Sequence, residues 1–342
     1  MDIKNIQIKN ILVVLGFPGI GDLLVAVPVF RALKKKFPEA NLSLSLRNQP
    51  GQLALLKSNP YFSKIIVFNK RGKKLNLFQS LRLLERWRRE KFDLIVVLHH
   101  SRRYAALSWL AGARVRLGYN TKGWRFFLNN VYFSDSFRYE AENLLEVIKP
   151  LGIQAKNPDL EIWLNPNEQE KIENWLRKRN ITNFIIIHPS GGWWGRRWPK
   201  ENYAKLADYL IRNFPIEVIF TGTPAEKGGI EKISSLMKEK PLIAAGEFTI
   251  RELACLYEKA KLFIGTDTGA MHVAAAVGLP TLVMFGPQDP RRWGPQSGGN
   301  QIIYKNLDCS PCPQRCRWGR NICMERITVE EVIKAAGKMI AV

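Results

Sequence analysis

The stretch FIGTDTGAMHVAAAVGLP, residues 263–280, holds the pattern that decides the fold. An apolar run leads to Asp267, a Thr-Gly pair follows, and the next nine residues, AMHVAAAVG, have helical composition. This order predicts a buried strand, a turn and a helix. A strand that is almost continuously apolar is typical of a parallel sheet covered by helices on both faces.

The same order of strand and helix recurs along the 342-residue chain in two series. Apolar, β-branched runs lie at 11–16, 42–46, 64–69, 93–98 and 114–119, and then at 183–190, 217–223, 241–246, 261–267 and 281–286. The alternation predicts an α/β protein with two doubly wound, Rossmann-like domains. The polar, Pro-containing region near 150–166 is the expected boundary, which gives domains of residues 1–160 and 161–327, with 328–342 as a closing helix.

Asp267-Thr268-Gly269 is also the triplet that carries the catalytic carboxylate of aspartic proteases. Those enzymes need a second carboxylate beside the first, whereas this chain has one copy, between a strand and a helix. A helix start offers free N–H groups to an anion, Thr268 adds a hydroxyl, and Gly269 allows close approach to the backbone. His272 would lie one turn along the same face. Alternatively, Asp267 is only a helix cap and His272 packs in the core.

A second loop suited to anions is HPSGGWWGRRWP, residues 188–199, which also follows a strand. Gly191 permits a close phosphate approach, Ser190 supplies a hydroxyl, and Arg196 supplies positive charge. Taken alone, the stretch reads equally well as a surface loop with stacked aromatic residues. Two such loops in one sheet favour a diphosphate ligand.

The segment GFPGIGD, residues 16–22, opens the first helix but lacks the GxGxxG spacing of dinucleotide sites. The next strand ends in Arg47, where a ribose-binding acid would be needed, so NAD is not favoured. Asp22 is either a helix cap or a general base facing an interdomain cleft. In the second domain, Glu226 is either a ligand for ribose hydroxyls or a first-turn helix charge.

The composition is strongly basic, with 52 Lys+Arg against 30 Asp+Glu and a net charge of +22. Such a field favours polyanionic partners. Residues 70–91 carry nine basic and two acidic side chains, which favours an anionic surface or substrate over a merely solvated helix. No nucleic-acid motif is present, so nucleic acid is not expected as a partner.

The sequence also bears on location. The longest nearly apolar run, 272–286, is shorter than the ~20 residues of a membrane span, and the run 11–15 is too short for a signal peptide. A cytoplasmic protein is therefore expected. Four of the five cysteines gather at Cys309, Cys312, Cys316 and Cys323, a spacing that suggests a structural cluster or a metal before disulfides.

Three stretches and the Cys-rich segment together resemble glycosyltransferase family nine, the ADP-heptose:lipopolysaccharide heptosyltransferases. The stretches are GDLLVAVPVFRALKKKFP (21–38), HPSGGWWGRRWPKENYAKLA (188–207) and FIGTDTGAMHVAAAVGLPTLVMFGP (263–287). The resemblance implies a GT-B fold, in which two Rossmann-like domains face a cleft and the last helix packs back on the first domain. It also implies an inverting, metal-independent transfer of heptose from ADP-heptose to an inner-core lipopolysaccharide acceptor, without a cofactor, at the inner face of the inner membrane.

Site roles follow from the same resemblance. Asp22 matches the family's proposed catalytic base, and Arg196 falls where many members have a Lys that contacts the donor phosphates. The matching nucleotide-sugar positions are Ser190, Gly191, Asp267, Thr268, Gly269 and His272, with Glu226 near the ribose or sugar and the backbone around Phe248 near the adenine. Two alternatives remain: a nucleotide-sugar epimerase of the same architecture, or a non-catalytic protein that binds anionic glycolipid.

Overall fold

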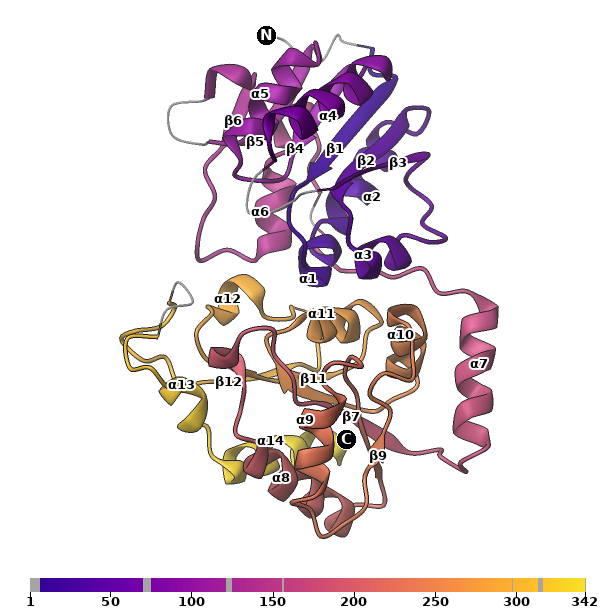
Figure 1. Cartoon of the computed structure of the whole chain (residues 1–342), viewed down its shortest axis with the longest axis vertical. Coiled ribbons are helices and arrows are strands. Elements are labelled where there is room, and N and C mark those ends of the chain that lie inside the picture. Colours follow the sequence, from indigo (N-terminus) through magenta and orange to yellow (C-terminus); the bar gives the residue numbers. More distant parts are fainter. Residues whose placement is uncertain are drawn as a thin grey trace. The chain divides into compact units, whose positions relative to one another are not determined.

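The computed structural model describes residues 7–69, 75–120, 125–155, 157–296, 298–312 and 316–341. The chain divides into two compact units, Met1–Leu160 and Glu161–Val342. Each unit is built around one parallel sheet (Figure 1). None of the helices in the described ranges is long and apolar enough to cross a membrane.

The sheet of the first unit has the strand order β3-β2-β1-β4-β5-β6. Its strands are β1 (Asn10–Leu15), β2 (Asn41–Arg47), β3 (Lys64–Phe68), β4 (Leu94–Val97), β5 (Val115–Tyr119) and β6 (Asn130–Tyr132). All neighbouring pairs are parallel. The central strand β1, NILVVL, is buried from its second residue on, as expected for a strand with helices on both faces.

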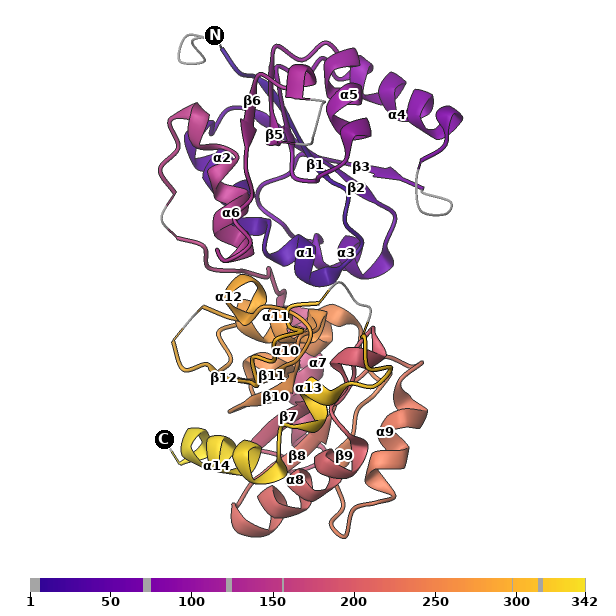
Figure 2. The same cartoon turned by 90° about the vertical axis from the view of Figure 1, so that its left-hand side faces the viewer.

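Helices cover both faces of this sheet. The helices of this unit are α1 (Ile20–Leu24), α2 (Val27–Lys36), α3 (Pro50–Leu55), α4 (Leu77–Arg89), α5 (Arg102–Leu110) and α6 (Glu140–Glu146), with short 3-10 turns η2 (Arg125–Phe127) and η3 (Lys149–Leu151). The helices α2 and α6 contact each other on one face, and α4 and α5 lie side by side on the other (Figure 2).

The sheet of the second unit has the order β12-β11-β10-β7-β8-β9 and is also parallel throughout. Its strands are β7 (Phe184–His188), β8 (Glu217–Phe220), β9 (Leu242–Ile243), β10 (Phe263–Thr266), β11 (Thr281–Phe285) and β12 (Gln301–Tyr304). Its helices are α7 (Pro166–Arg177), η4 (Trp194–Arg196), α8 (Lys200–Asn213), α9 (Lys227–Ser234), α10 (Ile250–Glu258), α11 (Gly269–Ala276), α12 (Pro290–Trp293), α13 (Ile322–Glu325) and α14 (Val329–Ile340).

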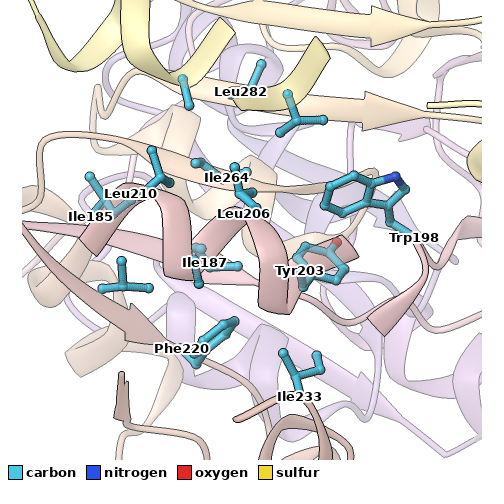
Figure 3. Close-up of a cluster of buried hydrophobic side chains, with 14 of the residues drawn as sticks. Ile185, Ile187, Trp198, Tyr203, Leu206, Leu210, Phe220, Ile233, Ile264 and Leu282 are labelled. Atoms are coloured by element: carbon cyan, nitrogen blue, oxygen red, sulfur yellow. The ribbon is translucent and has the colours of Figure 1, made fainter. Parts of the chain in front are cut away.

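The core of this second unit lies between α8 and the sheet (Figure 3). Leu206 and Leu210 of α8 are fully buried against strand residues such as Ile187. The closing helix α14 packs on α8 and buries Val332 and Ala336 in the same core. A further contact of α14 with the first unit stays a prediction.

The two parallel sheets with helices confirm the predicted α/β class. The expected strand at 241–246 is reduced to two residues, because the chain turns at Gly246 with a φ of 79°. The strands β6 and β12 were not expected. Both are short edge strands that are not fully buried: β6 has three residues, NVY, and β12 has four, QIIY.

Candidate active site

The strand order of the second unit brings two loops together. The neighbouring parallel strands β7 and β10 pair His188 with Gly265, so residues 189–199 and 267–269 leave the sheet at the same edge. The chain reverses its direction of strand addition between these strands, and open α/β sheets bind ligands at such a point. The two anion-suited loops, which the sequence places in one sheet, therefore follow neighbouring strands in the structure.

An ion pair joins the two loops. One terminal nitrogen of Arg196, Nη1, lies 3.3 Å from Asp267 Oδ2 and donates a hydrogen bond to the Asp267 carbonyl oxygen at 3.1 Å. Asp267 is buried, and the loss of water around its carboxyl raises the pKa, which the charge of Arg196 lowers in part. The contact holds a guanidinium at the end of β10.

Polar atoms beside this ion pair have no protein partner. The Nε atom of Arg196 and the hydroxyl of Thr268 are both buried without a hydrogen bond. Thr268 is the residue that caps α11, yet its side chain makes no capping bond, and Asp267 is not the cap. Because buried donors are normally satisfied, these atoms point to a polar ligand at the start of α11.

The remaining residues of this edge are held by backbone contacts. The Thr266 hydroxyl donates to the Ser190 carbonyl oxygen at 3.1 Å, and Arg197 Nε donates to the Gly191 carbonyl oxygen at 3.1 Å. Both bonds fix the course of the loop after β7. Gly269 is the first residue of α11, so its N–H group belongs to the unsatisfied end of that helix.

His272 lies in α11, one turn beyond Thr268, and is buried. Its ring centroid is 6.4 Å from that of Trp293. Burial lowers the pKa of His272 to about 4, and the nearby charge of Arg196 lowers it as well. The imidazole is therefore neutral around pH 7.

This low pKa makes stability depend on pH. Between about pH 6.5 and 4 an unfolded His272 binds a proton that the folded one does not, so the free energy of unfolding falls as the pH drops. We expect a loss on the order of 2 kcal/mol between about pH 7 and 4.5, and a smaller loss in His272→Gln. Urea unfolding at both pH values measures the difference. The raised pKa of Asp267 makes its own contribution to stability increase as the pH drops. Asp267 is present in both proteins, so this contribution cancels in the comparison. Identical pH dependence of the two proteins would contradict the assignment.

Glu226 and Phe248 follow the next two strands, β8 and β9. The Glu226 carboxylate accepts hydrogen bonds from the N–H and hydroxyl of Thr223, so it holds its own turn together. Phe248 packs edge-on against Trp175 with ring centroids 5.2 Å apart. Because neighbouring strands lie about 4.8 Å apart, the strands β10 and β9, which are three spacings apart, are separated by about 14 Å.

A buried polar chain beneath this edge was not foreseen from the sequence. His188 Nδ1 lies 3.1 Å from the Thr221 hydroxyl, which lies 2.9 Å from the Tyr257 hydroxyl. Burial lowers the pKa of His188 to about 4. The chain joins the ends of β7 and β8 to α10. The one signal in the sequence is a histidine at the end of an apolar strand.

In the first unit, Asp22 lies in the first turn of α1. Its Oδ2 atom accepts a hydrogen bond from the Gly19 N–H at 3.0 Å. The capping alternative for Asp22 is therefore present in the structure, although Gly19 is the cap residue itself. Gln52 was missed by sequence reasoning: it is fully buried and donates to the carbonyl oxygens of Phe17 and Gly19, at 3.1 and 2.7 Å. It fixes the loop that carries Asp22.

The cysteine segment borders the loop after β7. All five cysteines are free thiols. A cavity of about 250 Å³ is lined by Cys309, Cys312, Cys316 and Cys323 together with Trp193 and Gly195. Burial raises the pKa of the Cys323 thiol to about 11. Among the residues that the structure describes, no group of three or more His, Cys, Asp or Glu side chains is arranged to hold a metal ion.

Comparisons with known proteins place this geometry in a family. The model of "Glycosyltransferase family 9 (heptosyltransferase)" matches residues 80–320, more than half of the chain. Lipopolysaccharide heptosyltransferase 3 of Escherichia coli is 28% identical over 337 residues, covering 94% of this chain and 96% of the relative.

Solved structures agree in fold. A family 9 glycosyl transferase from Veillonella parvula superposes with a TM-score of 0.88, at 23% identity, over 98% of both chains. The Escherichia coli ADP-heptose lipopolysaccharide heptosyltransferase II superposes with a TM-score of 0.78, at 21% identity, over 97% of this chain and 99% of that one. The two α/β units are thus those of the GT-B fold, and the chain belongs to glycosyltransferase family 9.

Proposed function

We propose that this protein is an inverting glycosyltransferase that moves heptose from ADP-heptose to an inner-core lipopolysaccharide acceptor. The observation that carries the proposal is the end of β10, where Arg196 Nε and the Thr268 hydroxyl are buried without partners beside the Arg196–Asp267 ion pair. A diphosphate supplies the oxygen atoms that these donors lack. Family membership and the names of the relatives, which are lipopolysaccharide heptosyltransferases, support the heptose donor and the acceptor.

The second unit binds the donor. Arg196 and the N–H groups at the start of α11 contact the diphosphate, with Ser190 and Gly191 on the neighbouring loop. Glu226 faces the ribose or the sugar, and the backbone around Phe248 meets the adenine. The order of these roles follows the strand order β10-β7-β8-β9.

The chemistry is a single displacement at the anomeric carbon. Asp22 takes the proton from an acceptor hydroxyl, whose oxygen forms the new bond to that carbon. The bond from the carbon to the ADP oxygen breaks, and ADP leaves with an added negative charge. Arg196 and the positive end of α11 stabilise this charge. Because His272 is neutral, it adds no positive charge beside the diphosphate, and Arg196 provides it.

The first unit binds the acceptor. Helix α4 alone carries four arginines and one glutamate, which suits a phosphorylated, acidic glycolipid. Such an acceptor lies in the inner membrane, so we place the protein on the cytoplasmic face of that membrane. The family match and the relatives favour this transferase over the epimerase and over a non-catalytic glycolipid-binding protein.

A donor screen tests the proposal. The protein is incubated with ADP-heptose, another ADP-hexose or UDP-N-acetylglucosamine, with and without a Kdo-containing lipid acceptor, and the products are weighed by mass spectrometry. We expect the mass of the acceptor to increase by one heptose with ADP-heptose and with none of the other donors. A metal chelator should not change this result. A nucleotide sugar converted to its epimer in the absence of acceptor would replace the transferase with the epimerase.

A further inference from the structure

Helix α4 is apolar on two sides. Leu83, Leu84 and Trp87 are buried in the core of the first unit. On the solvent side, Leu77 is 76% exposed, Phe78 61% and Leu81 53%. Because a surface helix normally has a single apolar stripe that faces its core, the exposed residues need a second explanation.

More exposed apolar side chains lie on the neighbouring elements. Trp109 and Leu110, at the end of α5, are 51% and 40% exposed, and Phe126 of η2 is 68% exposed. Helix α4 contacts α5 (Figures 1 and 2), and η2 also contacts α5. Arg88 Nε of α4 donates to the Leu110 carbonyl oxygen at 2.9 Å. We call the three residues of α4, Leu77, Phe78 and Leu81, the exposed apolar face; Trp109, Leu110 and Phe126 are further exposed apolar residues on the neighbouring elements.

Arginines border this face on α4. The guanidinium of Arg82 lies over the ring of Phe78, 4.2 Å from its centroid. Arg86 donates to the Val67 carbonyl oxygen at 2.6 Å. The single acid of the helix, Glu85, is paired with Arg89. The helix therefore presents apolar side chains together with a net positive charge.

We propose that the exposed apolar face docks on an anionic lipid bilayer, with its two leucines and the ring of Phe78 entering the interface and the arginines of α4 at the level of the head groups. This combination of apolar and cationic side chains is what interfacial helices use. A second copy of the chain would bring like charges together, and nucleic acid would leave the leucines in water. The inference rests on the proposed function, because it supplies the means by which the first unit reaches a membrane-anchored acceptor.

Sedimentation with vesicles tests the docking. The probes are vesicles of phosphatidylcholine with about one third phosphatidylglycerol, and vesicles of phosphatidylcholine alone. We expect Leu77→Ser with Leu81→Ser, and separately Arg82→Gln, to lower the partition onto anionic vesicles by roughly tenfold. The matched controls lie in the second unit. Leu236→Ser with Ile302→Ser replaces two other exposed aliphatic residues. Arg179→Gln replaces an arginine whose guanidinium lies 4.2 Å from the Trp175 ring centroid, as that of Arg82 does from Phe78.

Transfer activity and self-association are measured on the same variants, to distinguish membrane docking from catalysis and from dimer formation. Transfer to a delipidated, water-soluble acceptor should be unchanged in the variant with Leu77→Ser and Leu81→Ser, because neither leucine is assigned a role in binding the donor or the acceptor. Failure of transfer in every protein would count against the proposed function and leave the vesicle result standing. Equal vesicle binding by the leucine variant and the wild type would overturn the docking. Self-association is measured by analytical ultracentrifugation. If the leucine variant lost self-association while its vesicle binding did not change, the face would be an interface between copies of the chain and the docking proposal would be wrong.

Discussion

Asp22→Asn is expected to lower turnover by roughly 10²–10⁴ while leaving ADP binding unchanged, because a general base contributes about that factor. Asparagine cannot take a proton from the acceptor hydroxyl. The donor contacts are assigned to the second unit, so calorimetry with ADP should give the wild-type affinity. Initial rates with saturating ADP-heptose and acceptor measure the turnover.

The Asp22→Asn substitution removes the proton acceptor but can keep the hydrogen bond that Asp22 makes at the start of α1. Asp22 Oδ2 accepts the Gly19 N–H, and the amide oxygen of asparagine can accept the same bond. Asp22→Ala removes both roles and should also lower the free energy of unfolding by about 0.5–1.5 kcal/mol, because the Gly19 N–H loses its acceptor. Turnover of Asp22→Asn within a factor of two of the wild type would remove Asp22 from the chemistry and leave it the capping role alone.

Arg196→Ala is expected to weaken ADP binding by about 10–100-fold. A hydrogen bond to a charged group contributes about 1.5–3 kcal/mol, and about 1.4 kcal/mol corresponds to a factor of ten in Kd. Arg196→Lys keeps the charge but loses the planar fork, so its affinity should lie between the two. Calorimetric titration with ADP measures all three proteins.

Arg196→Ala has two effects, the loss of the phosphate contact and the loss of the ion pair with Asp267, and a second variant is needed to distinguish them. Removal of the guanidinium also leaves the buried Asp267 carboxyl without its cation, which raises the pKa of that carboxyl further. Asp267→Asn breaks the same ion pair but keeps Arg196, and it should bind ADP far better than Arg196→Ala. Lys200→Ala, at an exposed lysine of α8, controls for loss of charge alone. If Arg196→Ala bound ADP as tightly as Lys200→Ala, the phosphate role would be wrong.

The sequence predicts those parts of the fold that follow from local pattern. The continuous apolar runs at β7 and β10, together with the helical segments between them, predict a parallel sheet, and parallel strands place their following loops at one edge. The adjacency of Arg196 and Asp267 follows only after the strand order is known. The edge strands β6 (NVY) and β12 (QIIY) are shorter than the predicted runs and are not fully buried, and they were not predicted.

The sequence does not reveal which distant side chains contact one another. Gln52 stands in a segment with ordinary loop composition, and only the folded structure shows its amide reaching the loop that carries Asp22. The His188, Thr221 and Tyr257 chain joins three elements that are separated in sequence, so no spacing rule could indicate it. The roles assigned to the site residues stay predictions until the variants are measured.

The reversal of strand order in the second unit also ties ligand binding to folding. The strands β7, β8 and β9 follow one another along the chain and pair in that order, whereas β10 must return across them to the other side of β7. A partly folded unit in which β10 has not docked keeps the loop with Arg196 but lacks Asp267, Thr268 and the start of α11. With the proposed site roles, we expect ADP to bind only to chains that have closed this long-range contact, so that its binding energy adds to the stability of the completed sheet alone.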